Sequence, residues 1–456
     1  AIQRLGTIWL EQGAPLRAAP FLLAARQMFP EDWESRTKLV LVFLYARQFE
    51  EARKEALAIL EASPANEQVM PLVVEASLTK EELEEAEQRL KSLNADDKAG
   101  FHLAMAGLWA RKGDLAAAES ETQRALSLNP NLVEAHLTLA KLYWAKNDLA
   151  SAEREFKAAT ETAPARSAAR LAYADFKIRT GATQEAKDLL NAVTRDVPDA
   201  LPAWRLLAQF AFAERNFDES LKLLDTAILR DPANIEARLL QAQVWLAQGE
   251  AKKATKSLEN LDVNYPKALV IKYHLARAYL QDQNPDQAAV VLNQALAENS
   301  EYTEAALLLA EVNLRTGKTQ EAIASMLDLL KRHPGLVQAQ VILAQAYQLS
   351  GRLEEAAEIF REQIATTPKS PAPYLSLGLI LRQQGKVDEA RKLVESAQQL
   401  APKSSLVASQ LVDLDLERKD YDRALRTVQK QLEDEPESVN AYFLQGKVYA
   451  AQGKWD

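Results

Sequence analysis

The chain has 456 residues, 48% of them hydrophobic, and its 64 Asp and Glu outnumber its 55 Lys and Arg, for a net charge of −9. This acidic balance argues against a general nucleic-acid binder, because such proteins need cations to neutralise phosphates. The absence of cysteine excludes disulfides, thiolate metal ligands and a cysteine nucleophile. No apolar run approaches the roughly 18 residues of a membrane-spanning helix, so we expect no span in this segment.

Proline recurs every 34 residues along most of the chain, and alanine recurs 12 residues before it. The prolines are Pro30, Pro64, Pro130, Pro164, Pro198, Pro232, Pro266, Pro334, Pro368, Pro402 and Pro436. The alanines are Ala18, Ala52, Ala86, Ala118, Ala152, Ala186, Ala254, Ala288, Ala322, Ala356, Ala390 and Ala424, with Ser220 at one copy. A period of this length indicates two helices per unit, stacked into a solenoid.

The remaining positions of the repeat agree with paired helices when the proline is counted as position 32. Position 8 is Gly or Ala in most copies, and with the alanine at position 20 it allows the two helices to cross closely. Position 15 is often glycine, as at Gly113 and Gly181, which suits the end of the first helix. Position 11 is aromatic in Trp9, Phe43, Trp109, Tyr143, Trp245, Tyr279, Tyr347 and Tyr449.

This pattern, kept in one register over the whole chain, resembles the tetratricopeptide repeat family. The resemblance implies an all-α fold, a right-handed superhelical solenoid of about 13.5 helix-turn-helix repeats. Such an array presents a surface for binding and is rarely a catalyst.

In chain order, residues 1–64 are predicted to form N-terminal repeats, 65–98 an irregular shortened repeat, and 99–456 a regular array that ends in a half repeat. In the irregular repeat Pro71 falls within the expected first helix, and Ser77 stands where an aromatic is usual. We therefore expect a shortened or kinked helix there. Segment 65–98 is either a joint in the array or a repeat that has diverged without mechanical consequence. Both ends of the sequence read as cut from a longer array.

No catalytic motif is found in the sequence: it has no phosphate-binding glycine loop, no HExxH and no GxSxG. The histidines (His102, His136, His274 and His333) lack metal-ligand spacing, and the acidic run at 81–88 is interpreted as a solvated helix face. We expect no enzyme activity, no cofactor and no metal site.

The resemblance implies that repeat positions 5, 9 and 12 line the concave face of the first helices. Position 9 is mostly polar here, and positions 5 and 12 are mostly apolar or aromatic, which suits an amphipathic helix or an extended peptide. The predicted partner-binding groove comprises Lys141, Trp144, Asp175, Arg205, Gln209, Phe212, Gln243, Tyr273, Arg277, Glu311 and Gln345. The competing interpretation is that the apolar members pack between neighbouring repeats.

The sequence thus predicts a non-catalytic scaffold that binds a protein or peptide. Two alternatives stay open. The Ala- and Leu-rich repeats are similar to those of bacterial cell-envelope proteins in polysaccharide secretion and exosortase-linked protein sorting, which would place the chain in the periplasm or envelope. The array could instead regulate a larger enzyme such as a glycosyltransferase. End-to-end self-association is a further hypothesis, because the final half repeat presents Tyr442, Phe443, Val448 and Tyr449 without a following helix.

Overall fold

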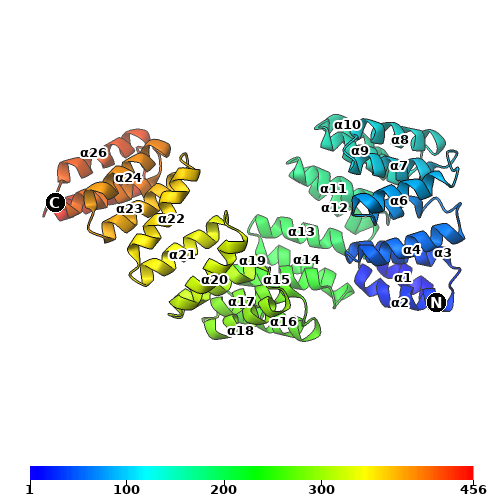
Figure 1. Ribbon diagram of the computed structural model, residues 1–456, viewed down its shortest axis with the longest axis horizontal. Helices are drawn as coiled ribbons and strands as arrows, with labels where there is room; N and C mark the ends of the chain where they lie inside the picture. Colours follow the sequence, from blue (N-terminus) through cyan, green and yellow to red (C-terminus); the bar gives the residue numbers. More distant parts are fainter. Residues whose placement is uncertain (455–456) are drawn as a thin grey trace. The chain divides into compact units, whose positions relative to one another are not determined.

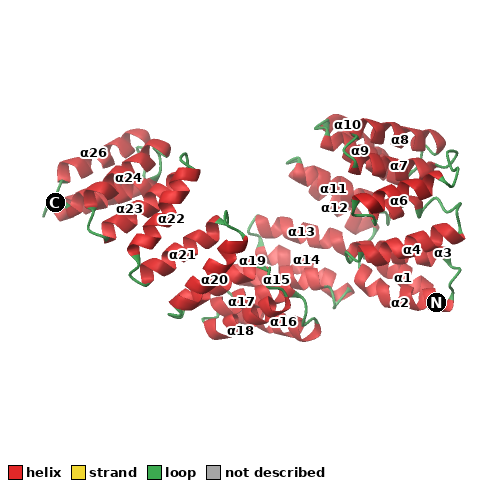
Figure 2. Cartoon of the chain, viewed as in Figure 1, coloured by secondary structure: helices red, strands yellow, loops and turns green. Residues whose placement is uncertain are grey.

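The computed structural model describes residues 1–454. These residues form 27 α-helices and no strand, so the all-α prediction is confirmed (Figures 1 and 2). Each helix packs chiefly on the helices next to it in the chain, which is the stacking expected of a repeat solenoid. The chain divides into two compact units, residues 1–248 and 249–456, here called the N-terminal and the C-terminal unit.

The N-terminal unit contains fifteen helices. They are α1 (Ile2–Glu11), α2 (Pro15–Met28), α3 (Trp33–Tyr45), α4 (Phe49–Ala62), α5 (Met70–Glu75), α6 (Lys80–Lys91), α7 (Ala99–Arg111), α8 (Leu115–Leu128), α9 (Val133–Ala145), α10 (Leu149–Thr162), α11 (Ala169–Arg179), α12 (Thr183–Asp196), α13 (Leu201–Ala213), α14 (Phe217–Arg230) and α15 (Ile235–Ala247).

The C-terminal unit contains the remaining helices of the described chain. They are α16 (Ala251–Asn264), α17 (Leu269–Gln281), α18 (Pro285–Glu298), α19 (Thr303–Arg315), α20 (Thr319–Arg332), α21 (Val337–Leu349), α22 (Leu353–Thr366), α23 (Pro371–Gln383), α24 (Val387–Leu400), α25 (Ser405–Glu417), α26 (Tyr421–Asp434) and α27 (Val439–Ala451).

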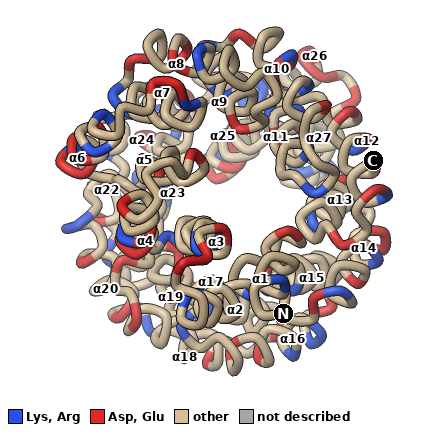
Figure 3. Tube along the Cα trace, turned by 90° about the vertical axis from the view of Figure 1, so that its right-hand side faces the viewer, with Lys and Arg blue, Asp and Glu red and all other residues tan. Residues whose placement is uncertain are grey.

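Odd-numbered helices are the first helices of their repeats and even-numbered helices are the second. Figure 3 shows α9, α11 and α13 of the N-terminal unit toward the inside, with α8, α10, α12 and α14 outside them. In the C-terminal unit α17, α19 and α23 likewise lie inside α16, α18, α20 and α22. The first helices therefore supply the inner face of each unit.

Helix ends follow local sequence signals. Asp148 is the N-cap residue of α10: its side chain accepts a hydrogen bond from the backbone N–H of Ser151 at 3.1 Å, which satisfies one of the free donors of the first turn. The first helices α7 and α9 are followed by a left-handed residue, Gly113 at φ 84° and Asn147 at φ 61°. Glycine adopts this conformation without strain and asparagine tolerates it, as the recurring position 15 predicts.

Small residues permit the close crossing of paired helices. Ala18, Ala52 and Ala118 are completely buried at position 20. At position 8, a Cβ added to Gly6 would lie 2.7 Å from Cδ2 of Leu22, so α1 and α2 approach too closely for a larger residue without a shift. These contacts explain why the repeat retains Gly or Ala at its crossing points.

The irregular repeat has a first helix, α5, of only six residues, whereas α3 and α7 have 13 each. The chain before α5 lies against the start of α7, where the backbone N–H of Gly100 donates to Oε2 of Glu67 at 3.0 Å. One continuous hydrophobic cluster runs from Ala18 to Leu108 through this repeat. A joint at 65–98 stays a prediction.

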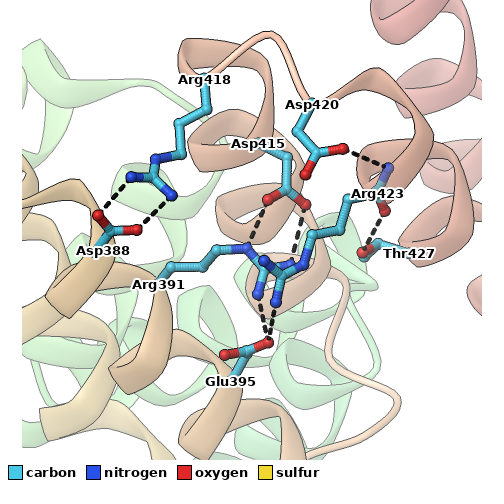
Figure 4. A network of polar contacts seen from close by, with 8 residues as sticks. All are labelled: Asp388, Arg391, Glu395, Asp415, Arg418, Asp420, Arg423 and Thr427. Carbon is cyan, nitrogen blue, oxygen red and sulfur yellow. Dashed lines mark hydrogen bonds and ion pairs between the residues drawn. The ribbon is translucent and has the colours of Figure 1, made fainter.

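A polar contact recurs between neighbouring repeats, from position 21 of one second helix to position 11 of the next first helix. The Tyr143 hydroxyl donates to Oε1 of Glu119 at 3.0 Å, and one repeat later Lys177 Nζ lies 2.6 Å from Oε1 of Glu153. Figure 4 shows a related contact in the C-terminal unit, where an arginine of α24 meets an aspartate of α25. Position 11 therefore links repeats even where it is not aromatic.

Candidate binding surface

The inner face of the C-terminal unit carries two adjoining hollows of about 450 and 690 Å³. We call this surface the inner hollow. It is formed by Tyr273 of α17, by Glu304, Leu307, Leu308, Glu311, Leu314 and Arg315 of α19, by Val337, Gln338, Val341, Ile342, Gln345, Gln348 and Leu349 of α21, and by Gln383 of α23.

The inner hollow combines uncovered apolar side chains with hydrogen-bonding groups. Val337 and Leu349, at the two ends of α21, are 55% and 66% exposed, although large apolar side chains gain free energy on burial. Glu311 and Gln345 occupy position 9 of successive repeats, are exposed, and line both hollows. The surface can therefore bury apolar groups while it satisfies the polar groups of a peptide.

An aromatic group marks one end of the inner hollow. The Tyr273 ring lies 6.2 Å from the Tyr302 ring and meets the His274 ring edge to face at 5.5 Å. Burial, and to a lesser extent the charge of Arg277, lowers the pKa of His274 to about 4. His274 is therefore neutral at physiological pH and supplies no positive charge beside Tyr273.

The predicted groove residues are divided between the two units. The structure brings Tyr273, Glu311 and Gln345 together in the inner hollow, and Arg277 is exposed on α17. The other predicted residues lie on α9, α11, α13 and α15 of the N-terminal unit: Lys141, Trp144, Asp175, Arg205, Gln209, Phe212 and Gln243.

Two predicted aromatic residues pack against other helices of the N-terminal unit. The Trp144 ring meets the rings of Phe176 and Phe156 edge to face, at 5.3 and 6.3 Å. Phe212 lies 6.0 Å from the Phe217 ring and packs against a hydrophobic cluster. Of these ring contacts, Trp144–Phe176 joins α9 to α11 of the next repeat, as the competing interpretation expects.

The remaining residues of the predicted set are polar. Lys141 and Gln209 are exposed, whereas Arg205 and Gln243 are half-buried. Asp175 is half-buried and accepts a hydrogen bond from Nε of Arg179 at 3.1 Å. Their assignment to a binding groove stays a prediction.

Sequence reasoning missed Val337, Leu349 and Gln383, because it considered only positions 5, 9 and 12. A signal was present for Leu349: it is a large aliphatic residue at position 13, where Arg315 and Gln383 of the adjacent repeats are polar. The first and last residues of α21 line the hollow together with residues from its middle.

Another hollow, of about 540 Å³, lies in the N-terminal unit beside the short helix α5. The sequence analysis placed no binding site here, although Pro71, which lines this hollow, marked the irregular repeat. Its lining is Glu34, Thr37, Lys38, Leu41, Glu67, Gln68, Pro71, Leu72, Ala99, Gly100, Leu103, Asn129, Leu132 and Glu134.

Within residues 1–454, no helix is both long and apolar enough to cross a bilayer. The same residues contain no group of three or more His, Asp or Glu placed to hold a metal ion.

Two family models described as tetratricopeptide repeat match the sequence. One matches residues 110–165, 145–210, 211–278, 314–380, 347–411 and 381–448, and the other matches 273–337. No curated protein matches the chain.

Solved structures of low identity resemble the fold. A tetratricopeptide repeat protein from Parabacteroides merdae is 18% identical over 54% of this chain and 96% of its own, with a TM-score of 0.44. Yeast Tom70 is 15% identical over 99% of this chain and 95% of its own, with a TM-score of 0.43. A thermophilic TPR protein of Thermus thermophilus is 24% identical over 41% of this chain and 99% of its own, with a TM-score of 0.32.

Proposed function

We propose that this chain, which belongs to the tetratricopeptide repeat family, holds a peptide segment of a partner protein in the inner hollow of its C-terminal unit. Proteins of this family are generally non-catalytic scaffolds for protein interaction. The observation that carries the finer proposal is the pair of exposed aliphatic residues, Val337 and Leu349, on either side of Gln345.

The hollow suits a segment with apolar side chains about one helix length apart. Val337 and Leu349 are the first and last residues of the 13-residue helix α21. Covering each of them removes apolar surface from water, at about 25 cal/mol per Å². Glu311 offers a carboxylate that only accepts hydrogen bonds, and Gln345 offers an amide that both donates and accepts them.

Because these groups stand on packed helices, binding costs little ordering of the receptor. The affinity of one hollow is modest, and additional contacts along the inner face raise it by avidity. The cell-envelope and enzyme-regulating alternatives differ from each other in the identity of the partner. An identified partner from a polysaccharide secretion system or a glycosyltransferase would decide between them.

The test is selection of peptides from a random display library on the wild-type protein, followed by binding of those peptides to two variants. Leu349→Asp places a charge in the hollow and is expected to weaken binding about tenfold or more. Val263→Asp is the matched control, since Val263 is an exposed aliphatic residue on the outer helix α16. Equal losses for both variants, or none for Leu349→Asp, would show that the selected peptides bind elsewhere.

A further inference from the structure

The first repeat of the N-terminal unit touches repeats far along its own chain. Nε2 of Gln12 donates to Oδ2 of Asp199 at 2.9 Å, across 187 residues. Nη1 of Arg17 lies 2.5 Å from Oδ1 of Asp231, across 214 residues. Figure 1 shows α1 and α2 beside α13 and α14 accordingly.

Further contacts extend this surface. The Tyr45 hydroxyl at the end of α3 donates to Oε1 of Glu236 on α15 at 2.7 Å. Ala14 is buried in one hydrophobic cluster with Leu201 of α13. A Cβ added to Gly13 would lie 2.6 Å from Cγ of Pro202, so the backbone of Gly13 lies directly against the proline ring.

Stacking alone does not produce this contact, because each unit of a solenoid normally meets only its neighbours. The repeats from α1 to α15 are joined in sequence. In addition, the repeats of α1/α2 and α3/α4 touch those that contain α13, α14 and α15. The N-terminal unit is therefore a closed ring of repeats, and both partners of the closing contact belong to this unit.

Asp231 provides a preformed, buried carboxylate that can bind a guanidinium group. Its side chain is 3% exposed, and the backbone N–H of Ala233 donates to it at 3.2 Å. The Arg17 guanidinium that reaches this carboxylate also lies over the Trp9 ring, 3.7 Å from the ring centroid. A buried carboxylate needs such a partner, because an isolated charge in a dry site is strongly disfavoured.

The closing contact differs from the interfaces between adjacent repeats. Neighbouring repeats share many completely buried large side chains such as Leu22, Leu39 and Ile59. At the closing contact, Ala14 and the partly buried Trp9 pack against the cluster that contains Leu201, beside hydrogen bonds and one ion pair. The Arg17 side chain is still 37% exposed. Water can replace the polar partners that Gln12, Arg17 and Tyr45 lose on separation.

We propose that the first repeat is a reversible latch, which docks in cis on the surface of α13, α14 and α15 and closes the N-terminal unit into a ring. Release of Arg17 from Asp231 opens the ring and with it the inner face of this unit. The proposal goes beyond the peptide-binding function, which concerns the C-terminal unit.

The chain has no cysteine, so two introduced cysteines label it at chosen sites without further changes. Gln27→Cys on α2 and Leu229→Cys on α14 carry nitroxide spin labels at exposed positions of the two docked helices. Double electron–electron resonance on the full chain is expected to give one narrow distance for the closed ring. If the labelled protein with unchanged Arg17 and Asp231 gave a broad or long distance distribution, the proposal would be overturned.

Arg17→Gln removes the guanidinium without altering the turn that holds the carboxylate, and Asp231→Asn removes the carboxylate charge. Each is expected to raise the ratio of open to closed ring about tenfold or more, seen as a second, longer distance. Asp218→Asn, at an exposed carboxylate of α14, is the matched control and is expected to leave the distance unchanged. An unaltered distribution in both Arg17→Gln and Asp231→Asn would show that the pair does not hold the ring closed.

Discussion

Arg391 of α24 and Asp415 of α25 form an ion pair in which both side chains are buried, 6% and 1% exposed, with Nε 2.6 Å from Oδ1. The pair occupies the positions where Tyr143 meets Glu119 and Lys177 meets Glu153. Relative to Lys177 and Glu153 the charges are reversed, because here the second helix carries the cation and the first helix the anion. The same two repeat positions thus form a polar contact between repeats in each case, but the residue types that form it differ.

Removal of one partner of this pair is expected to destabilise the C-terminal unit. Asp415→Leu leaves a buried guanidinium with Glu395 as its remaining partner on α24, at a cost of about 3 kcal/mol. The double variant Arg391→Met/Asp415→Leu should recover most of that loss, since apolar residues of similar size often replace a buried pair without penalty. Urea unfolding followed by circular dichroism measures both changes.

The control for this prediction is Asp388→Asn, which breaks the exposed pair with Arg418 (Figure 4). It should change stability by less than about 1 kcal/mol. A double variant as unstable as Asp415→Leu alone would contradict the interpretation that the buried guanidinium left without Asp415 is the cause.

Two glycines of α7 should respond in opposite directions to the same substitution. A Cβ at Gly100 would lie 2.3 Å from the backbone oxygen of Glu67, so Gly100→Ala forces the backbone before α5 to move and is expected to cost about 1–3 kcal/mol. At Gly107 the nearest atom is Cγ1 of Val74 at 3.4 Å, and Gly107→Ala should stabilise the helix by up to about 1 kcal/mol. Thermal unfolding of the two variants is a direct comparison, and destabilisation by both would refute it.

Acid should destabilise the C-terminal unit through His274, whose pKa burial lowers from 6.5 to about 4. Well above pH 6.5 the residue is neutral in both states and contributes no pH dependence. Between pH 6.5 and about 4 the unfolded chain binds a proton that the folded chain does not. The free energy of unfolding therefore decreases as the pH is lowered through this range, by at most about 3 kcal/mol.

The measurement for His274 is the urea midpoint as a function of pH, in the wild type and in His274→Gln. The variant does not titrate in this range, so its midpoint should fall less steeply between pH 6.5 and 4. Parallel curves for the two proteins would show that His274 is not responsible for the acid sensitivity.

Trp144 distinguishes packing from binding among the predicted groove residues. Because its ring meets Phe156 and Phe176, Trp144→Ala is expected to destabilise the N-terminal unit by about 3 kcal/mol. Lys141→Ala, one turn earlier on the same helix and exposed, should change stability by less than about 0.5 kcal/mol. Differential scanning calorimetry of the two variants distinguishes a packing role from a binding role. A Trp144→Ala protein as stable as the wild type would favour the binding role for Trp144.

The local architecture could be predicted from the sequence because each repeat is specified by residues within or next to it. Ala18 and Ala52 mark a helix crossing that needs a small residue, Gly113 marks a helix end, and Pro71 accompanies the short helix α5. Each of these signals acts over a few turns of chain, where periodicity and sterics suffice.

Part of the candidate site was also accessible from the sequence. Tyr273, Glu311 and Gln345 follow from the repeat register and lie in the inner hollow. Trp144 shows the limit of such reasoning, because an aromatic residue in the same register can pack against Phe176 of the next repeat. Register places a residue on a helix face, and only the packed neighbours determine how much of it stays exposed.

The sequence by itself determined the helices, their pairing and the family, because these depend on contacts between residues close together in the chain. Only the tertiary structure decided that Arg17 reaches Asp231, 214 residues away. That meeting depends on the small rotation between successive repeats, summed over the repeats that separate the two residues. No single repeat encodes the sum, so neither residue carries a sequence signal for the other.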